Sequence, residues 1–98
     1  MVSQLRIYII KPGMMDSWLT LFNEQIRPVH KQYGIPIEHT WVNTDQTEFI
    51  WVRSFDSAED IPRKEAEYSG SPERQALGNQ PQNYIEKVEV RVIETVDR

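Results

Sequence analysis

The sequence predicts an α+β fold of the ferredoxin-like type, in which four antiparallel strands form one sheet and two helices cover one of its faces. Two observations lead to this prediction. Strand-like and helix-like segments follow the order βαββαβ, which suits one sheet with right-handed crossovers. The 98 residues suffice for one domain, residues 1–98, and include no cysteine, so the core must hold by packing alone.

The first strand and the first helix are predicted from the N-terminal third of the chain. Leu5–Ile10 reads LRIYII, and the Pro-Gly pair of Lys11–Gly13 ends this strand. Apolar side chains then recur every three or four residues, which indicates the buried face of a helix. Pro28 predicts a kink in this helix, and Gly34 suits a left-handed cap at its end. The apolar stripe consists of Met15, Trp18, Phe22, Ile26, Val29 and Tyr33.

The remaining elements follow in the same way. Ile35–Asn43 and Glu48–Phe55 are apolar and β-branched runs separated by the polar turn TDQT, so they predict a hairpin. A second helix is expected to begin between Ser57 and Pro62, because both residues favour a helix start. Ser71–Gly78 predicts a short helical turn, and Tyr84–Val96 predicts a long last strand.

Both faces of this sheet are predicted to be apolar. In the first strand Leu5, Ile7 and Ile9 alternate with Tyr8 and Ile10, and in the third strand Phe49, Trp51 and Phe55 alternate with Ile50 and Val52. Two helices can cover only one face, and an exposed apolar sheet face is rare in a monomer. The simplest cover is a second copy of the chain, so we expect a homodimer with Val52 and Val90 as candidate interface positions.

Composition excludes several classes of protein. Lys and Arg total 11 and Asp and Glu total 15, which gives a net charge of −4 without a basic stripe. Nucleic acid is therefore not an expected partner, because duplex binding depends on neutralising phosphates. No apolar run approaches the ~20 residues of a membrane span, and the N-terminus does not read as a signal peptide. We expect a soluble, cytoplasmic protein that does not bind membranes.

Three motifs stand in a defined order along the chain. They are LRIYIIKPG at Leu5–Gly13, FIWVRSFDS at Phe49–Ser57 and EYSG at Glu67–Gly70. Together these motifs resemble the NIPSNAP family, within the dimeric α/β-barrel superfamily. The resemblance spans nearly the whole chain and implies a ferredoxin-like domain whose sheets pair into a barrel.

Single residues match the family's pattern. Its first strand carries an Arg and a Tyr two apart before a Pro-Gly, its third strand ends in an Arg followed by an aromatic residue and a Ser, and its second helical region has an aromatic residue before a Gly. The matching residues are Arg6, Tyr8, Pro12, Gly13, Arg53, Phe55, Ser57, Tyr68 and Gly70. Relatives often have a Trp shortly after that Gly, where this chain has Pro72, Glu73 and Arg74. Superfamily members include cofactor-free monooxygenases, decarboxylases, dehydratases, isomerases and ligand-binding proteins, so this fold does not settle the function.

Arg53 is the most informative side chain, because it interrupts an aromatic strand. It either pairs with a carboxylate for purely structural reasons or offers its guanidinium to an acidic ligand in a cleft between sheet and helices. In the second case its neighbours form an apolar wall with a few polar groups, as small-molecule sites do. The candidate ligand-binding residues are Arg53, Tyr8, Trp51 and Tyr68.

The two histidines give a weaker signal. His39 in the second strand is the candidate catalytic base, although a histidine in a strand is more often a packed or half-exposed residue. His30 lies beside the apolar stripe of the first helix. No spacing indicates a catalytic triad or a metal site, so neither a metal nor a cofactor is expected. The charged stretch Glu59–Glu67 is interpreted as a solvated helix face.

Two functional hypotheses remain open. In the first, each protomer binds a small aromatic or acidic molecule in the cleft without turnover. In the second, the protein is a cofactor-independent enzyme of the monooxygenase, isomerase or lyase type, in which His39 or a tyrosine moves a proton and Arg53 stabilises an oxyanion. The sequence favours the first hypothesis because it offers one plausible cation and no committed base.

Overall fold

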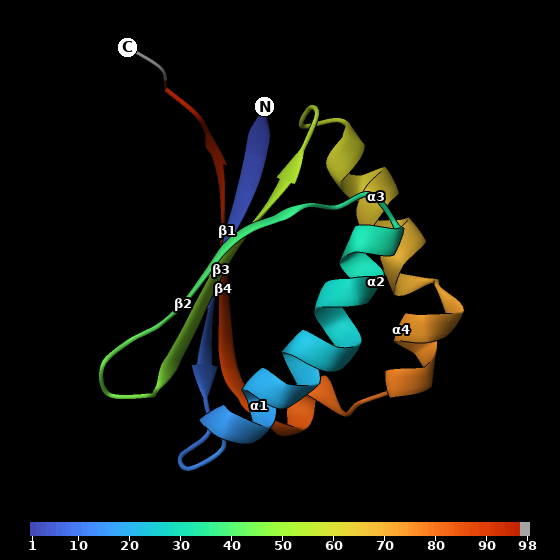
Figure 1. Cartoon of the computed structure of the whole chain (residues 1–98). Helices are drawn as coiled ribbons and strands as arrows, with labels where there is room; N and C mark the ends of the chain where they lie inside the picture. The colour runs from blue at the N-terminus through green and yellow to red at the C-terminus, as the bar shows by residue number, and fades with distance from the viewer. Residues whose placement is uncertain (97–98) are drawn as a thin grey trace.

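The computed structural model describes residues 1–96, and these residues form the predicted sheet. Its strands lie in the order β2-β3-β1-β4, and every neighbouring pair is antiparallel. Figure 1 shows the helices on one side of the sheet, while the described residues place no helix on the other side. The strands are β1 (Val2–Ile10), β2 (Ile37–Val42), β3 (Glu48–Phe55) and β4 (Ile85–Glu94).

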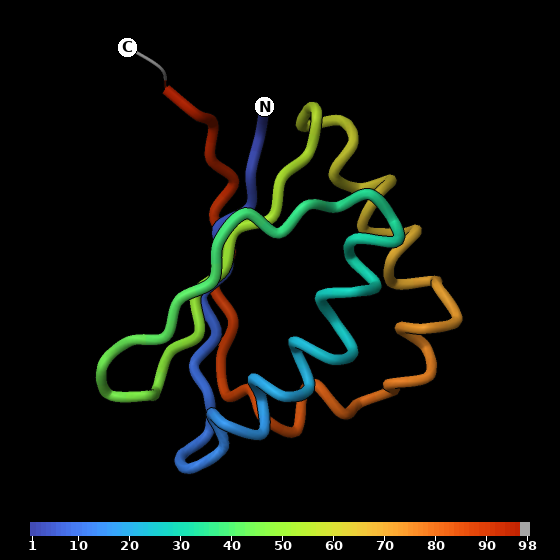
Figure 2. Tube along the Cα trace, viewed as in Figure 1, coloured from blue at the N-terminus to red at the C-terminus, as the bar shows by residue number. Residues whose placement is uncertain are grey.

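The helical layer consists of two parts. A continuous helical segment follows β1, as Figure 2 shows. It contains α1 (Met15–Leu21), the π-helical segment η1 (Phe22–Ile26) and α2 (Arg27–Gln32). The second part follows β3 and contains α3 (Asp60–Ser69), α4 (Pro72–Leu77) and the 3₁₀ turn η2 (Pro81–Asn83). The expected start between residues 57 and 62 is confirmed by α3, which carries its proline in the first turn.

The interruption predicted at Pro28 takes the form of a π-helical segment one turn earlier. The backbone N–H of Arg27 donates to the carbonyl of Phe22, five residues back. Pro28 has no N–H and lies in the first turn of α2, where a missing donor is tolerated. The helical segment therefore continues past the proline, and His30, which follows it, is still buried.

The core fills the space between the helices and the inner face of the sheet, which we define as the face that the helices cover. Tyr8 and Ile10 of β1 and Phe49 and Trp51 of β3 pack against the apolar stripe of α1 and η1. The aromatic rings meet edge to face, for example Phe22 and Phe49 with centroids 4.7 Å apart. Leu21, which is not part of the predicted stripe, is buried with it, so the buried residues of α1 and η1 are Met15, Trp18, Leu21, Phe22 and Ile26.

The strand register assigns each side chain to a face. Tyr8 lies opposite Phe49 and faces the helices, whereas Leu5, Ile7, Ile50 and Val52 alternate with the core residues and face outward. In the strand register Arg6 lies opposite Trp51 on β3 and opposite Val90 on β4. Residues that lie opposite each other share a face of the sheet, so Val90 also lies on the helix side. The two valines that the sequence suggested as interface positions therefore lie on opposite faces of the sheet.

Among the described residues, no helix combines the length and the apolar composition that crossing a bilayer requires.

Candidate functional site

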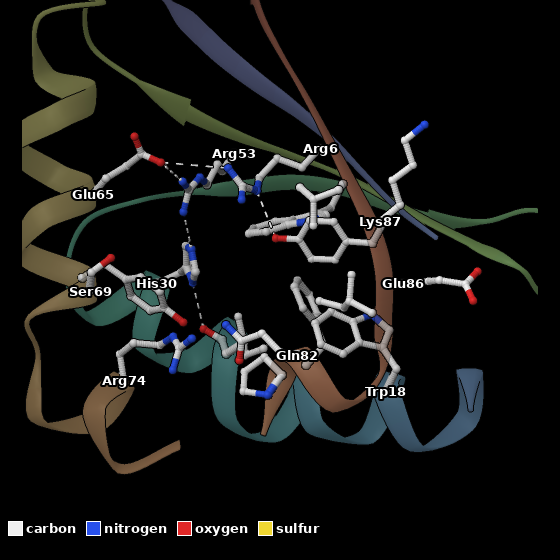
Figure 3. Close-up of a pocket in the computed structure, with 18 residues that line it drawn as sticks. Arg6, Trp18, His30, Arg53, Glu65, Ser69, Arg74, Gln82, Glu86 and Lys87 are labelled. Carbon is white, nitrogen blue, oxygen red and sulfur yellow. Dashed lines mark hydrogen bonds and ion pairs between the residues drawn. The ribbon is translucent and has the colours of Figure 1, made fainter. Parts of the chain in front are cut away.

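A pocket lies between the inner face of the sheet and the helices (Figure 3). Its volume is about 410 Å³. Its walls come from the strands β1, β3 and β4, from the helical segment α1–η1–α2, and from α3, α4 and η2. Trp18, Phe22 and Trp51 form an aromatic part of the wall, while Arg6 and Arg53 form a charged part. The pocket thus combines apolar surface with a few strong hydrogen-bond donors.

Arg53 is held in this pocket by three elements of the fold. It is only 5% exposed, and its Nε donates to Gln4 Oε1 on β1 at 2.8 Å. Its Nη1 lies 3.0 Å from His30 Nε2 on α2, and its Nη2 donates to Glu65 Oε2 on α3 at 2.6 Å. A guanidinium has five N–H groups, so these three contacts leave two for another acceptor.

A second arginine increases the positive charge of the pocket. Arg6 donates from Nε to the Tyr8 hydroxyl at 3.0 Å and from Nη1 to Gln4 Oε1 at 3.3 Å. Its Nη1 lies 3.9 Å from Glu65 Oε2, which is too long for a hydrogen bond. Burial and, next, the like charge of Arg6 lower the pKa of Arg53 to about 10, although Glu65 opposes this shift.

The charges that line the pocket do not balance. The lining includes three cations, Arg6, Arg53 and Arg74, and one carboxylate, Glu65, while Glu86 and Lys87 at the rim cancel each other and point away from the interior in Figure 3. The sum is 3 − 1 = +2, although the whole chain carries −4. The pocket is therefore a positive site in an acidic protein, which is the electrostatic setting for an anion.

His30 is a buried, neutral member of this network. It is 1% exposed, and its Nδ1 lies 3.0 Å from the carbonyl oxygen of Ile26, which can only accept a hydrogen bond. Nδ1 therefore carries the proton, and Nε2 accepts from Arg53. Burial lowers the pKa of His30 to about 4, and the nearby Arg53 acts in the same direction. Both ring nitrogens are thus engaged.

The structure brings all four predicted ligand-binding residues into this one pocket. Arg53, Tyr8, Trp51 and Tyr68 line it from β1, β3 and α3. The ring of Tyr68 lies 4.2 Å from the ring of His30, and burial raises the pKa of the Tyr68 hydroxyl, which keeps it protonated.

His39, the predicted catalytic base, lies elsewhere. It pairs with Val52 and is exposed on the outer face of the sheet, beside the ring of Trp41 at 5.4 Å. A substrate in the pocket would lie on the other side of the sheet from this imidazole. Within the described residues, no group of three or more His, Asp or Glu side chains is arranged to hold a metal ion.

Glu65, His30 and Arg74 line the pocket but were not among the predicted site residues, although helical spacing contains the signal for Glu65 and His30. Glu65 lies four residues after Ile61 and three before Tyr68, on the buried side of α3. The interpretation of Glu59–Glu67 as a solvated face is wrong at this position, because Glu65 contacts Arg53. His30 lies four residues after the buried Ile26, on the same side of the helix.

Comparisons with known proteins identify the family. The profile described as NIPSNAP matches residues 3–97. The chain belongs to the NIPSNAP family. No curated protein matches the sequence.

Solved structures share this fold at low sequence identity. An uncharacterized NIPSNAP domain protein from Burkholderia xenovorans is 17% identical over 98% of this chain and 95% of its own, with a TM-score of 0.88. A NIPSNAP family protein from Agrobacterium tumefaciens is 21% identical over 98% and 93%, with a TM-score of 0.88. A putative antibiotic biosynthesis monooxygenase from Nitrosomonas europaea is 8% identical over 99% and 100%, with a TM-score of 0.74. The fold that these proteins share with this chain does not identify a reaction or a ligand, and the biochemical role of this NIPSNAP protein is undetermined.

Proposed function

We propose that this NIPSNAP protein binds a small molecule with an acidic group and an apolar, aromatic body in the pocket between sheet and helices. The observation that carries the proposal is the charge of the pocket. Two arginines, Arg6 and Arg53, lie with one carboxylate between them in the inner layer of a protein whose net charge is negative. Guanidinium groups suit carboxylates because they donate two parallel hydrogen bonds.

The size and walls of the pocket support the same class of ligand. A volume of about 410 Å³ lies within the range of roughly 300 to 1,000 Å³ that is usual for small-molecule sites. Trp18, Phe22 and Trp51 offer ring surface to an aromatic body. The Nε1 groups of Trp18 and Trp51 are buried without an acceptor among the described residues, so an acceptor on the ligand would relieve an unfavourable burial.

Binding without turnover fits this geometry better than proton transfer does. A general base needs a free lone pair within reach of the substrate, and His30 uses Nδ1 toward Ile26 and Nε2 toward Arg53. The alternative, a cofactor-independent enzyme, draws its support from the fold shared with the putative antibiotic biosynthesis monooxygenase of Nitrosomonas europaea. Fold likeness alone is a weak argument for a reaction.

The proposal is tested by titrating the protein with benzoate, salicylate and phenylacetate, and with benzamide as the neutral counterpart of benzoate. We expect at least one of the acids to bind, and benzamide to bind at least tenfold more weakly than benzoate, since a hydrogen bond to a charged group contributes about 1.5 to 3 kcal/mol. Arg6→Gln should weaken binding of the acid by a similar factor. Isothermal titration calorimetry measures each affinity.

Arg63→Gln is the matched control, because it removes the same charge from an exposed position on α3 that pairs with Asp60 and Glu67. This variant should bind the acid as the wild type does. If no acid binds at millimolar concentration, the proposed function is wrong. Consumption of a bound acid over hours would instead favour the enzyme.

We also propose that the protein is a homodimer that pairs through the outer face of the sheet. The outward side chains of β1 and β3 are mainly apolar and only half-buried in the single chain, namely Leu5, Ile7, Ile9, Ile50 and Val52. Trp41 on the neighbouring strand is 48% exposed on the same face. A second copy would remove this surface from water.

A further inference from the structure

We propose that Glu65 is an internal counter-ion of the pocket, and that the carboxylate of the ligand replaces it on Arg53 and Arg6. This inference rests on the proposed function and deepens it, because it specifies a monocarboxylate as the charged group and Glu65 as the residue that sets its affinity.

The geometry places Glu65 where a ligand carboxylate would bind. Its Oε2 lies 2.6 Å from Arg53 Nη2 and 3.9 Å from Arg6 Nη1, so one oxygen lies between the two cations. Among the described residues, no other carboxylate lies within ion-pair distance of either arginine. Figure 3 shows Glu65 reaching from α3 toward both guanidinium groups. Glu65 therefore occupies the part of the pocket in which a second carboxylate would find its best donors.

The two partners of this ion pair differ in how freely they can move. The Arg53 side chain is 6% exposed and is also fixed by Gln4 and His30, whereas the Glu65 side chain is 37% exposed. Glu65 can turn toward water, where a carboxylate is well solvated, while Arg53 would lose two further hydrogen bonds if it moved. If a ligand carboxylate replaces Glu65 while Arg53 stays in place, the only hydrogen bond of Arg53 that is lost is the one to Glu65.

The chemistry of the occupied position selects the class of ligand. A carboxylate is planar and carries one charge, as the Glu65 side chain does, and with Glu65 displaced the N–H groups of Arg53 that do not contact Gln4 or His30 can donate to it. With Glu65 displaced, the pair of arginines faces one new anion, and the aromatic wall of Trp18, Phe22 and Trp51 contacts its body. An aromatic or aliphatic monocarboxylic acid fits this arrangement.

The test compares benzoate and benzamide binding to the wild type and to Glu65→Gln by calorimetry. Removing the competing carboxylate should raise the affinity for benzoate by about tenfold, because the ligand no longer displaces a charged hydrogen bond. Benzamide affinity should change by less than about twofold. A residue that merely positions Arg53 would give the opposite result, since its removal would weaken benzoate binding.

Two controls remove the same charge elsewhere. Glu86→Gln alters a residue at the rim of the pocket that points away from the arginines, and Glu67→Gln alters an exposed residue of α3 that pairs with Arg63. Both should leave the benzoate affinity within about twofold of the wild type, because solvent and salt screen exposed charges. A gain in affinity equal to that of Glu65→Gln in these variants would assign the effect to net charge and overturn the proposal.

The outcomes separate this inference from the proposed function. If the wild type binds benzoate and Glu65→Gln binds it equally or less well, the counter-ion role is wrong while the binding function stands. If neither protein binds any acid, the function itself fails. Should Glu65→Gln not fold, the side-chain carboxyl carbon signal of Glu65 in the wild type decides, because saturating benzoate should shift it and leave Glu67 unchanged. An unmoved Glu65 signal overturns the proposal.

Discussion

Arg53 has the surroundings that either of its two predicted roles would require. It pairs with the carboxylate of Glu65, as a structural arginine would, and it also lines the pocket, as a ligand-binding arginine would. The sequence could predict that this guanidinium needs partners, because a buried charge without them is costly. It could not identify Gln4, His30 and Glu65 as those partners, since they lie on three different elements that only the fold brings together.

His30 makes the stability of the protein depend on pH. Its pKa is about 4 in the folded protein and about 6.5 in the unfolded chain. Between these values the unfolded chain takes up a proton that the folded protein refuses, so the free energy of unfolding falls as the pH decreases from 6.5 to 4. We expect a slope of up to about 1.4 kcal/mol per pH unit from this residue, measured by urea denaturation at a series of pH values.

The variant His30→Gln isolates this contribution from the acidic side chains that titrate in the same range. It should lose the extra slope, although its stability at pH 7 is lower because the hydrogen bond from Nδ1 to the Ile26 carbonyl is lost. His39→Gln changes an exposed histidine and should keep the slope of the wild type. Equal slopes for the wild type and His30→Gln would contradict the buried, neutral state of His30.

At the scale of elements, local signals predicted the strands and most helix ends. Gly34 has a φ of 72°, as the predicted cap requires, and the Ser71 side chain accepts from the backbone N–H of Arg74 at the start of α4. The π-helical segment before Pro28 could not be predicted in this form, because a proline signals an interruption without its hydrogen-bond pattern. The spacing of Glu65 from Ile61 and Tyr68 was present in the sequence, but Glu59–Glu67 was interpreted as a solvated face, because the sequence alone does not show which helix packs over Arg53.

Gly34 gives a prediction for the turn between α2 and β2. In Gly34→Ala the residue would keep a positive φ that disfavours a side chain, and the new Cβ would lie 2.9 Å from Lys64 Nζ. Lys64 donates from this atom to the carbonyl of Tyr33, so its displacement weakens the contact between α3 and the turn. We expect a loss of about 1 to 2 kcal/mol in the free energy of unfolding, measured by urea denaturation.

Gly13→Ala separates the backbone effect from the contact with Lys64. Gly13 also has a positive φ, 75°, but a Cβ there would meet no atom within 4 Å. This variant should lose about 1 kcal/mol, and the difference between the two variants measures the Lys64 contact. A Gly34→Ala variant as stable as the wild type would show that the turn does not need the left-handed conformation.

At the scale of the whole molecule, the two faces of the sheet differ in composition and in whether helices cover them. The inner face combines core residues with the arginines of the pocket, and the outer face presents Leu5, Ile7, Ile50 and Val52 without helices over them in the described part of the chain. The sequence could predict that both faces are apolar, because alternation does not depend on tertiary packing. It could not say which set the helices cover, and the register now assigns Val52 and Val90 to opposite sides.

This assignment makes the proposed dimer testable with one matched pair of variants. Val52 lies on the outer face between Leu5 and His39, whereas Val90 lies on the helix side of the edge strand β4. If the outer face is the interface, Val52→Asp buries a charge against the second copy and should reduce the mass in solution from twice 11.6 kDa to 11.6 kDa. Val90→Asp should stay dimeric, because it adds the same charge at a 40% exposed position on the other side.

Sedimentation equilibrium at micromolar concentration measures the mass, and circular dichroism confirms that each variant is folded. A monomeric wild type would exclude the dimer, and dissociation by Val90→Asp alone would move the interface to the exposed valines of β4.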